Sequence, residues 1–236
     1  MPTILAIETS SELASCALLR DGTVSSRESS GVRTHSASIL PMVQELLKEA
    51  GAALGDVDAI AFGSGPGSFT GVRTACGIAQ GLAFGASLPV VPVVTLPAMA
   101  LACHERSGAT DILTVLDARM GEVYWAQYRR TADGWLTVAE PVLSAPGDVA
   151  PVPVDGLVAC GNGISAHPEV FAGKPFAAGA LTSILPHAEQ VARLAETEFA
   201  AGRGVPAAQA QPLYLRNKVA YTSAERKVIN AAKDAA

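Results

Sequence analysis

The sequence predicts an α/β protein made of two lobes, the second of them reduced. Two observations lead to this expectation. Short apolar runs that suit buried strands alternate with segments whose apolar residues recur every three to four positions, the period of an amphipathic helix. The alternation then starts again after residue 107, with the same kinds of segment in the same order. We therefore expect one lobe over residues 1–107 and a smaller lobe over residues 108–236.

The first lobe opens with strands predicted over residues 4–7, 15–20 and 23–28. The first of these is an apolar run of strand length, and Glu8 ends it. Asp21-Gly22 stands between the second and third strands, and both residues tolerate the positive φ of a tight hairpin turn. The chain is therefore expected to begin as a β-meander.

Helix and strand patterns alternate through the rest of the first lobe. Apolar residues between positions 39 and 50 recur at the helical period, and Gly51 follows them as a stop signal. Pro41 either begins this helix or kinks it. The further predicted elements are a strand over 57–62, a glycine-rich loop over 63–71, a helix over 72–84, a strand over 90–94 and a helix over 96–105.

The second lobe repeats this opening and then becomes rich in loops. A buried strand over 112–116 ends in the acid Asp117, as the first strand of the chain ends in Glu8. The spacing from the acid to the next Asp-Gly turn differs, so the likeness is one of structure and not a sequence repeat. The further predicted elements are strands over 123–129, 135–138 and 157–160, a loop over 141–156, a helix between 188 and 199, and a helical or frayed tail after Lys218.

Two successive β-meanders, each followed by α/β elements, are typical of the actin-like ATPase and sugar-kinase (ASKHA) fold. In that fold the turns after the first strand of each lobe face a nucleotide cleft. Glu8 and Asp117 could face this cleft and hold Mg²⁺ through water, or they could be the polar ends of buried strands. A short second lobe would clamp a nucleotide poorly. We therefore expect at most weak binding of ATP or ADP with Mg²⁺ at a degenerate cleft.

The composition limits the class of protein. The 236 residues are 49% hydrophobic and 17% charged, as expected of a globular chain. Neither a run of 18 apolar residues nor a secretory signal is present, so we expect no membrane contact. Four cysteines without a Cys-x-x-Cys motif suit reduced core thiols in a cytoplasmic protein. The net charge of −5 argues against a strongly basic surface, so nucleic-acid contacts would fall to a partner.

The glycine-rich segment from Gly63 to Arg73 is the strongest motif. Its glycines permit tight backbone geometry, and the free N–H groups at the start of the following helix could bind an anion. The Gly-Lys-Ser/Thr ending of a P-loop is absent. The segment is therefore either an anion or nucleotide contact, or a structural turn with a capping hydroxyl. The candidate contact residues are Thr9, Ser10, Gly65, Gly67, Ser68, Thr70, Gly71 and Arg73.

Glycines also recur along the helix that follows this loop. Gly77, Gly81 and Gly85 are four residues apart, and each costs a helix about 1 kcal/mol relative to alanine. Such a stripe allows another backbone to come close, which is either part of the same chain or a partner subunit. If the stripe serves a partner subunit, we expect the first two helices of this chain to form the surface that binds it. The candidate interface residues are His35, Ile39, Val43, Gly77 and Gly81.

The pattern of side chains predicts neither a metal site nor a catalytic nucleophile. A metal site on the first helix would need a second histidine four residues after His35, and Ile39 stands there. His35 is otherwise a capping or surface residue. The stretch from Gly65 to Phe69 does not fit the Gly-x-Ser-x-Gly elbow of hydrolases.

Several stretches, in order along nearly the whole chain, resemble the TsaB family. They are ILAIETS at 4–10, HS at 35–36, LPMV at 40–43, GPGSFTGVR at 65–73, LDAR at 116–119, GEVY at 121–124 and PLYLR at 212–216. The resemblance implies a two-lobed actin-like fold. It also implies a non-catalytic subunit of the bacterial complex that transfers threonylcarbamoyl to N6 of adenosine 37 in tRNAs reading ANN codons.

The same resemblance implies partners. The family forms a heterodimer with the catalytic TsaD, works with the ATPase TsaE, reaches tRNA through the complex and can form homodimers. TsaD holds its metal with a histidine pair on its first-lobe helix, where this chain keeps one histidine at most. Two alternatives stay open. An ATP-dependent phosphotransferase of the sugar-kinase type would need a full second lobe, and a peptidase would need a metal pair or a nucleophile.

Overall fold

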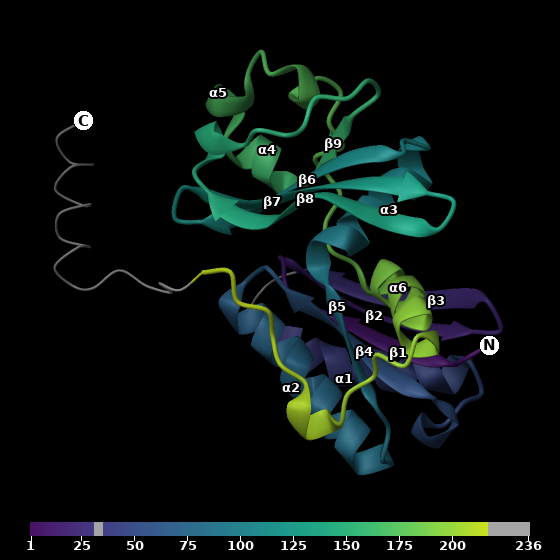
Figure 1. Cartoon of the computed structure of the whole chain (residues 1–236). Helices are drawn as coiled ribbons and strands as arrows, with labels where there is room; N and C mark the ends of the chain where they lie inside the picture. Colours follow the sequence, from purple (N-terminus) through teal and green to yellow (C-terminus); the bar gives the residue numbers. More distant parts are fainter. Residues whose placement is uncertain (31–34, 217–236) are drawn as a thin grey trace, which may run out of the picture.

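The computed structural model describes residues 1–30 and 35–216 and divides them between two α/β lobes (Figure 1). The first lobe is the lower one in this view, and the second lobe is the upper one. None of the helices in the described ranges combines the length and the hydrophobicity that a membrane span requires. The tail predicted after Lys218 lies outside the described residues.

A five-stranded mixed sheet forms the first lobe. Its strands are β1 (Ile4–Glu8), β2 (Leu13–Arg20), β3 (Thr23–Ser30), β4 (Ala59–Gly65) and β5 (Val90–Val94), in the spatial order β3-β2-β1-β4-β5. The first three strands are antiparallel neighbours, whereas β4 and β5 run parallel to β1. The predicted opening meander is therefore confirmed.

Helices cover both faces of this sheet. α1 (His35–Glu49) and α2 (Phe69–Ala86) pack on one face, against a core that includes Ile7 of β1. The opposite face, which includes Ile4, is covered by α6 (Ala188–Ala200). Because side chains on both faces of β1 are buried, this strand is apolar without interruption and shows no polar alternation.

The second lobe is a four-stranded sheet with little helix. Its strands are β6 (Asp111–Arg119), β7 (Glu122–Thr131), β8 (Gly134–Ser144) and β9 (Val158–Cys160), in the order β8-β7-β6-β9. The helices that follow β9 are α4 (Asn162–Ala166) and α5 (Pro168–Phe171), each barely more than one turn. The short 3₁₀ turns within the described residues are η2 (Leu54–Asp56), η3 (Pro146–Asp148), η4 (Pro175–Ala177) and η5 (Ala207–Gln209). These short helices agree with the expectation of a reduced second lobe.

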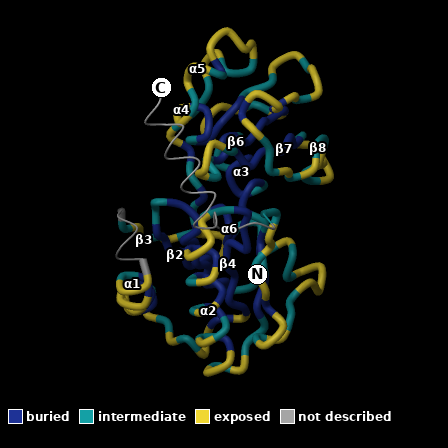
Figure 2. Tube along the Cα trace, turned by 90° about the vertical axis from the view of Figure 1, so that its left-hand side faces the viewer, coloured by how far each residue is buried: buried dark blue, intermediate teal, exposed yellow. Residues whose placement is uncertain are grey.

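The return of α6 to the first lobe departs from the predicted division of the chain. α3 (Thr95–Ser107) leads from β5 into the second lobe, close to the predicted boundary at residue 107. Figures 1 and 2 both show α6 beside the first-lobe strands, and its Val191 is fully buried there. The first lobe is thus assembled from both halves of the sequence, and residues 108–236 do not form one unit.

Several predicted element boundaries differ from the structure, and the loop predicted over 63–71 is shortened because β4 extends to Gly65 and α2 begins at Phe69. α1 begins at His35 and runs through Pro41, so the helix does not begin at the proline. β8 continues to Ser144, where a loop had been predicted from residue 141. Pro141 is tolerated because β8 is the edge strand of its sheet, where a missing N–H leaves no ladder partner unpaired.

Candidate functional site

The β1–β2 turn and the glycine-rich loop pack directly against each other. The Thr9 hydroxyl donates a hydrogen bond to the Gly71 carbonyl (2.7 Å), and the Ser68 amide donates to the Ser10 carbonyl (2.7 Å). A Cβ on Gly67 would lie 2.6 Å from the Ser10 carbonyl oxygen, and one on Gly71 would lie 1.9 Å from the Thr9 carbonyl oxygen. These glycines are therefore required by the approach of the chain's own backbone.

The N-terminus of α2 is capped from within the chain. Ser68 is the N-cap, and its hydroxyl accepts a hydrogen bond from the Gly71 amide (3.4 Å). The guanidinium of Arg73 lies 3.2 Å from the ring centre of Phe69 and 4.8 Å from that of Tyr214. The arrangement is the structural turn with a capping hydroxyl, while the anion contact by this loop stays a prediction.

The other two residues of the predicted contact set, Gly65 and Thr70, also form hydrogen bonds within the chain. Gly65 has a φ of +105° and precedes Pro66 through a cis peptide bond, and its amide donates to the Thr95 hydroxyl (3.0 Å). Thr70 is exposed on the first turn of α2, and its carbonyl accepts from the Thr74 hydroxyl (3.0 Å). The fold brings the whole predicted set together around the β1–β2 turn and the start of α2.

A cavity of about 260 Å³ lies in the cleft between the lobes. Its polar wall includes Asn162, whose side chain accepts from the Asp117 amide (3.0 Å) and donates to the Glu12 carboxylate (3.1 Å). Arg119 forms an ion pair with Asp117 (2.9 Å). The contact between Asn162 and Glu12 therefore joins the two lobes, while the other two contacts lie within the second lobe.

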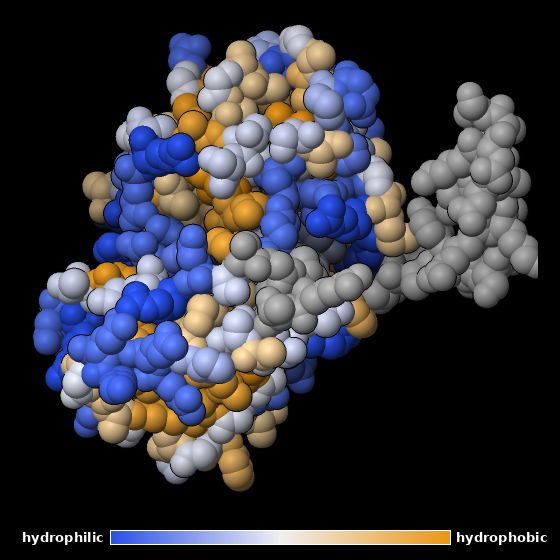
Figure 3. All heavy atoms as spheres, turned by 180° about the vertical axis from the view of Figure 1, so that it is seen from behind, coloured by the Kyte–Doolittle hydropathy of each residue, from blue (hydrophilic) through white to orange (hydrophobic). Residues whose placement is uncertain are grey.

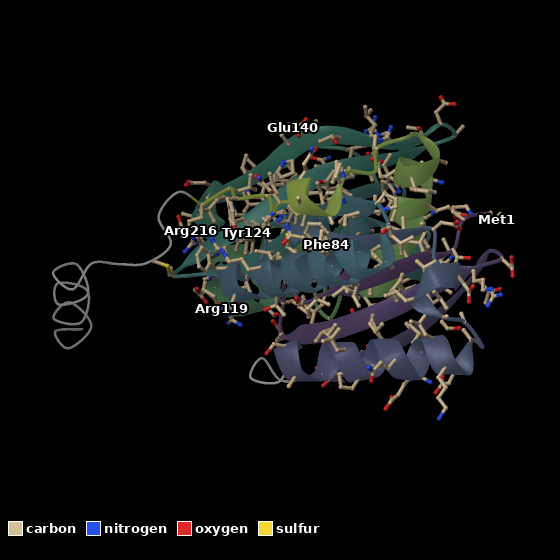
Figure 4. The ribbon with its side chains drawn as sticks, turned by 90° about the horizontal axis from the view of Figure 1, so that it is seen from below. Met1, Phe84, Arg119, Tyr124, Glu140 and Arg216 are labelled. Carbon is tan, nitrogen blue, oxygen red and sulfur yellow. The ribbon has the colours of Figure 1, made fainter. Side chains whose placement is uncertain are left out.

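The apolar wall of this cavity comes from the second lobe and the C-terminal segment. It includes Leu116, Tyr124 and Leu215, and Figure 4 shows Tyr124, Arg119 and Arg216 gathered at one end of the molecule. Burial raises the pKa of Tyr124, and the neighbouring Arg216 guanidinium opposes this rise.

Glu8 does not reach this cavity, contrary to one of the two readings of the paired acids. It is fully buried, and its carboxylate accepts a hydrogen bond from the Ser10 amide. A Cβ on Gly63 would lie 1.7 Å from its Oε2 atom, so the glycine makes room for this carboxyl group. Glu8 is the polar end of a buried strand, whereas Asp117 faces the cavity together with Glu12.

Replacing Glu8 by glutamine should change how stability depends on pH. Burial raises the pKa of Glu8 above its ordinary value of 4.5, because the charged form is poorly solvated. Wild-type stability should therefore be lost as the pH rises from 4.5 through the raised pKa. Glu8→Gln lacks this loss, and we expect it to gain about 1–3 kcal/mol over wild type toward pH 8.

Urea unfolding between pH 4.5 and pH 8 would measure this gain. Glu169→Gln, at an exposed position on α5, controls for the removal of one carboxylate. Parallel stability curves for wild type and Glu8→Gln would contradict the assignment of a buried, poorly solvated carboxyl group.

The outer face of α2 carries the glycine stripe. Added Cβ atoms on Gly77, Gly81 or Gly85 would meet no described atom within 4 Å, so the stripe does not pack on the described part of the chain. Phe84 beside it is 82% exposed. Figure 3 shows that apolar side chains of the first lobe also reach the surface on another side of the molecule, between hydrophilic ones.

Two of the predicted interface residues lie elsewhere. Ile39 and Val43 point into the first-lobe core, where they are 0% and 3% exposed. The helical period that marks an amphipathic helix identifies its buried stripe, and the prediction assigned that stripe to a partner. Leu40, at 44% exposure, lies on the outer face of α1 instead. His35 begins α1, and its side chain lies outside the described part of the structure.

Sequence reasoning missed two residues that shape the cleft. Glu12 and Asn162 are 150 positions apart, and neither belongs to a local motif that predicts their contact. No group of three or more His, Cys, Asp or Glu side chains in the described ranges is arranged to hold a metal ion.

Comparisons with known proteins agree with this architecture. A family model described as TsaD, tRNA N6-adenosine threonylcarbamoyltransferase, matches residues 23–233. The tRNA threonylcarbamoyladenosine biosynthesis protein TsaB of Escherichia coli K12 is 42% identical, over 92% of this chain and 96% of its own length. The chain belongs to the TsaB/TsaD family.

Further relatives place the chain on the TsaB side of this family. TsaB of Haemophilus influenzae is 40% identical, over 93% of this chain and 95% of its own length. A solved Pseudomonas aeruginosa structure called YeaZ matches with a TM-score of 0.83 at 42% identity, over 91% of this chain and all of that one. A second structure from that organism, described as similar to peptidase YEAZ, gives a TM-score of 0.84 at 43% identity, over 92% of this chain and all of that one. The resemblance found in the sequence is confirmed, as is the two-lobed α/β fold.

Proposed function

We propose that this TsaB-family chain is a non-catalytic subunit that binds TsaD and supports threonylcarbamoyl transfer to N6 of adenosine 37 in tRNAs reading ANN codons. TsaE is the proposed ATPase partner, and tRNA contacts are made through the assembled complex. The proposal rests on family membership and on one observation of this structure, the glycine face of α2, on which no described residue packs.

The glycine face of α2 is costly unless something covers it. Three exposed glycines in one helix destabilise it by about 1 kcal/mol each relative to alanine, and no described residue packs on them. A helix of a partner could approach this surface to backbone distance, with Phe84 as an adjacent apolar anchor. We assign this surface to TsaD in the complex, and to a second copy of the chain when TsaD is absent.

Two features support the assignment of a non-catalytic role. Ile39 occupies the position at which the helix would need a second histidine, and this side chain is packed into the core. The interlobe cavity of about 260 Å³ is smaller than the 300–1,000 Å³ that ligand pockets typically enclose. We propose that ATP or ADP with Mg²⁺ binds weakly at most in this cleft.

Placing arginine at Gly81 should abolish binding to TsaD without unfolding the chain. The new side chain starts in open space, so folding should be kept, while its bulk and charge prevent close approach of a partner helix. We expect affinity for TsaD to fall at least about a hundredfold, the effect of losing an interface hot spot. Titration of purified TsaD by calorimetry measures it.

Thr197→Arg provides the matched control for this experiment. It adds the same side chain to an exposed position on α6, and binding should stay at the wild-type level. Equal affinities for Gly81→Arg and Thr197→Arg would locate the TsaD surface elsewhere. Reconstituted tRNA modification with and without the chain tests the function itself, since equal modification in both reactions contradicts a supporting subunit.

A thermal shift experiment separates this proposal from the phosphotransferase alternative. Saturating Mg-ATP stabilises a protein that binds it, by about 2.7 kcal/mol at a hundredfold excess over Kd. We expect the melting temperature of the isolated chain to change by less than one degree, on the order of measurement error for so weak a ligand. An increase of several degrees would favour a nucleotide-dependent enzyme.

A further inference from the structure

The last described residues, 211–216, cross from one lobe to the other. Figure 1 shows this segment in yellow, running along α2 and then toward the gap between the lobes. Four of its residues, Leu213 to Arg216, line the interlobe cavity. The other two crossings of the chain, between α3 and β6 and before α6, contribute no residue to that lining. The segment therefore joins the lobes at the cavity itself.

Contacts with the first lobe fix the beginning of this segment. The Ala210 carbonyl, just before it, accepts a hydrogen bond from the Gln80 side chain of α2 (3.0 Å). The Leu213 amide donates to the Ser64 carbonyl at the end of β4 (2.7 Å). The Tyr214 ring stands 6.3 Å from the ring of Phe69, centre to centre. Three successive contacts therefore hold this part on α2 and β4.

Contacts with the second lobe fix its end. Leu215 packs against the second-lobe core. The Arg216 guanidinium forms an ion pair with Glu122 (2.6 Å) and donates to the carbonyls of Ala118 (3.1 Å) and Arg119 (3.3 Å). Its side chain is only 12% exposed, so this ion pair is screened less than a surface pair. Arg216 thereby binds the β6–β7 hairpin through its side chain.

We propose that residues 211–216 form a strap that holds the two lobes closed over the cavity, with Arg216 as its latch. The two covalent crossings act as a hinge, since a few residues at element ends can absorb the rotation between lobes. Leu213 to Arg216 of the strap form part of the cavity wall. Releasing the latch loosens this closed arrangement, against the Glu12–Asn162 hydrogen bond that also joins the lobes, and makes the β1–β2 turn and the β6–β7 hairpin easier to expose.

Hydrogen exchange of the full-length chain tests the strap. In Arg216→Ala, backbone amides of the β1–β2 turn (residues 9–12) and the β6–β7 hairpin (residues 117–122) should exchange about ten- to a hundredfold faster, the effect of removing a buried charge-assisted hydrogen bond. Amides of α6, remote from the cavity, should exchange as in wild type. Glu122→Ala should have the same local effect, and the double variant should add little to either single change, because both residues act as one contact.

Arg203→Ala is the matched control, since Arg203 is an exposed arginine paired with Glu198 and makes no link between lobes. Its exchange pattern should equal that of wild type. Two results would overturn the strap. One is unchanged exchange of both turns in Arg216→Ala. The other is acceleration by the same factor throughout both lobes, α6 included, because Arg216 would then stabilise the fold as a whole.

Discussion

Replacing Gly71 by alanine is expected to destabilise the first lobe by about 3–5 kcal/mol, the range of severe packing defects. The added Cβ would stand 1.9 Å from the carbonyl oxygen of Thr9, and this neighbour is backbone that cannot rotate away. The hydrogen bond from the Thr9 hydroxyl to the Gly71 carbonyl fixes the two segments at this distance. The chain must therefore shift the β1–β2 turn away from α2 or give up the contact.

Gly85→Ala is the matched control for this prediction. It lies in the same helix, and an added Cβ there meets no described atom within 4 Å. Helix propensity alone should then stabilise the variant by up to about 1 kcal/mol. Urea unfolding followed by circular dichroism measures both variants. Equal midpoints for Gly71→Ala and wild type would show that the two segments separate without cost.

Placing aspartate at Val191 should destabilise the chain by about 3–5 kcal/mol or prevent folding at 37 °C. Val191 is fully buried where α6 packs on the first-lobe sheet, in a cluster of apolar side chains. The change removes a packed apolar group and buries a carboxylate without a partner. The effect should appear in the first lobe, although Val191 follows the second lobe in the sequence.

Thr197→Asp, at an exposed position of the same helix, controls for the loss of helix propensity. It should change the free energy of unfolding by less than about 0.5 kcal/mol, as surface substitutions usually do. Limited proteolysis with identification of the first cleavage sites follows the outcome. If Val191→Asp left β1 to β5 as protected as in wild type, α6 would not be part of the first lobe.

The order of strands and helices could be predicted from the sequence because it is recorded locally. The buried run of β1, the hairpin at Asp21-Gly22 and the helical period of α1 each lie within about fifteen residues. A second meander, whose first strand ends in Asp117, then predicted a second lobe. The sheet on which α6 packs could not be predicted in this way. Its apolar stripe shows that one face is buried, but the residues of the helix do not indicate which sheet covers that face.

The candidate site was predicted less completely, for the same reason. The Gly63–Arg73 segment contains the end of β4, a short turn and the start of α2, so the loop predicted over 63–71 was too long. Two of its glycines, Gly67 and Gly71, serve the approach of Ser10 and Thr9. The apolar period of α1 was read as a surface, whereas Ile39 and Val43 belong to the core. Contacts such as that between Glu12 and Asn162 join residues 150 positions apart, and a single sequence carries no record of such a pairing.

The return of α6 also sets the order in which this protein can fold during its synthesis. The strands β1 to β5 are complete once residue 94 has been made, but the helix that covers their second face ends at residue 200. At about 5–20 residues per second, roughly 5–20 seconds separate these two events on the ribosome. During that interval the apolar face that includes Ile4, Ala17 and Val91 lacks the cover that α6 provides in the folded chain. The nascent first lobe therefore exposes more apolar surface than the folded lobe until α6 emerges.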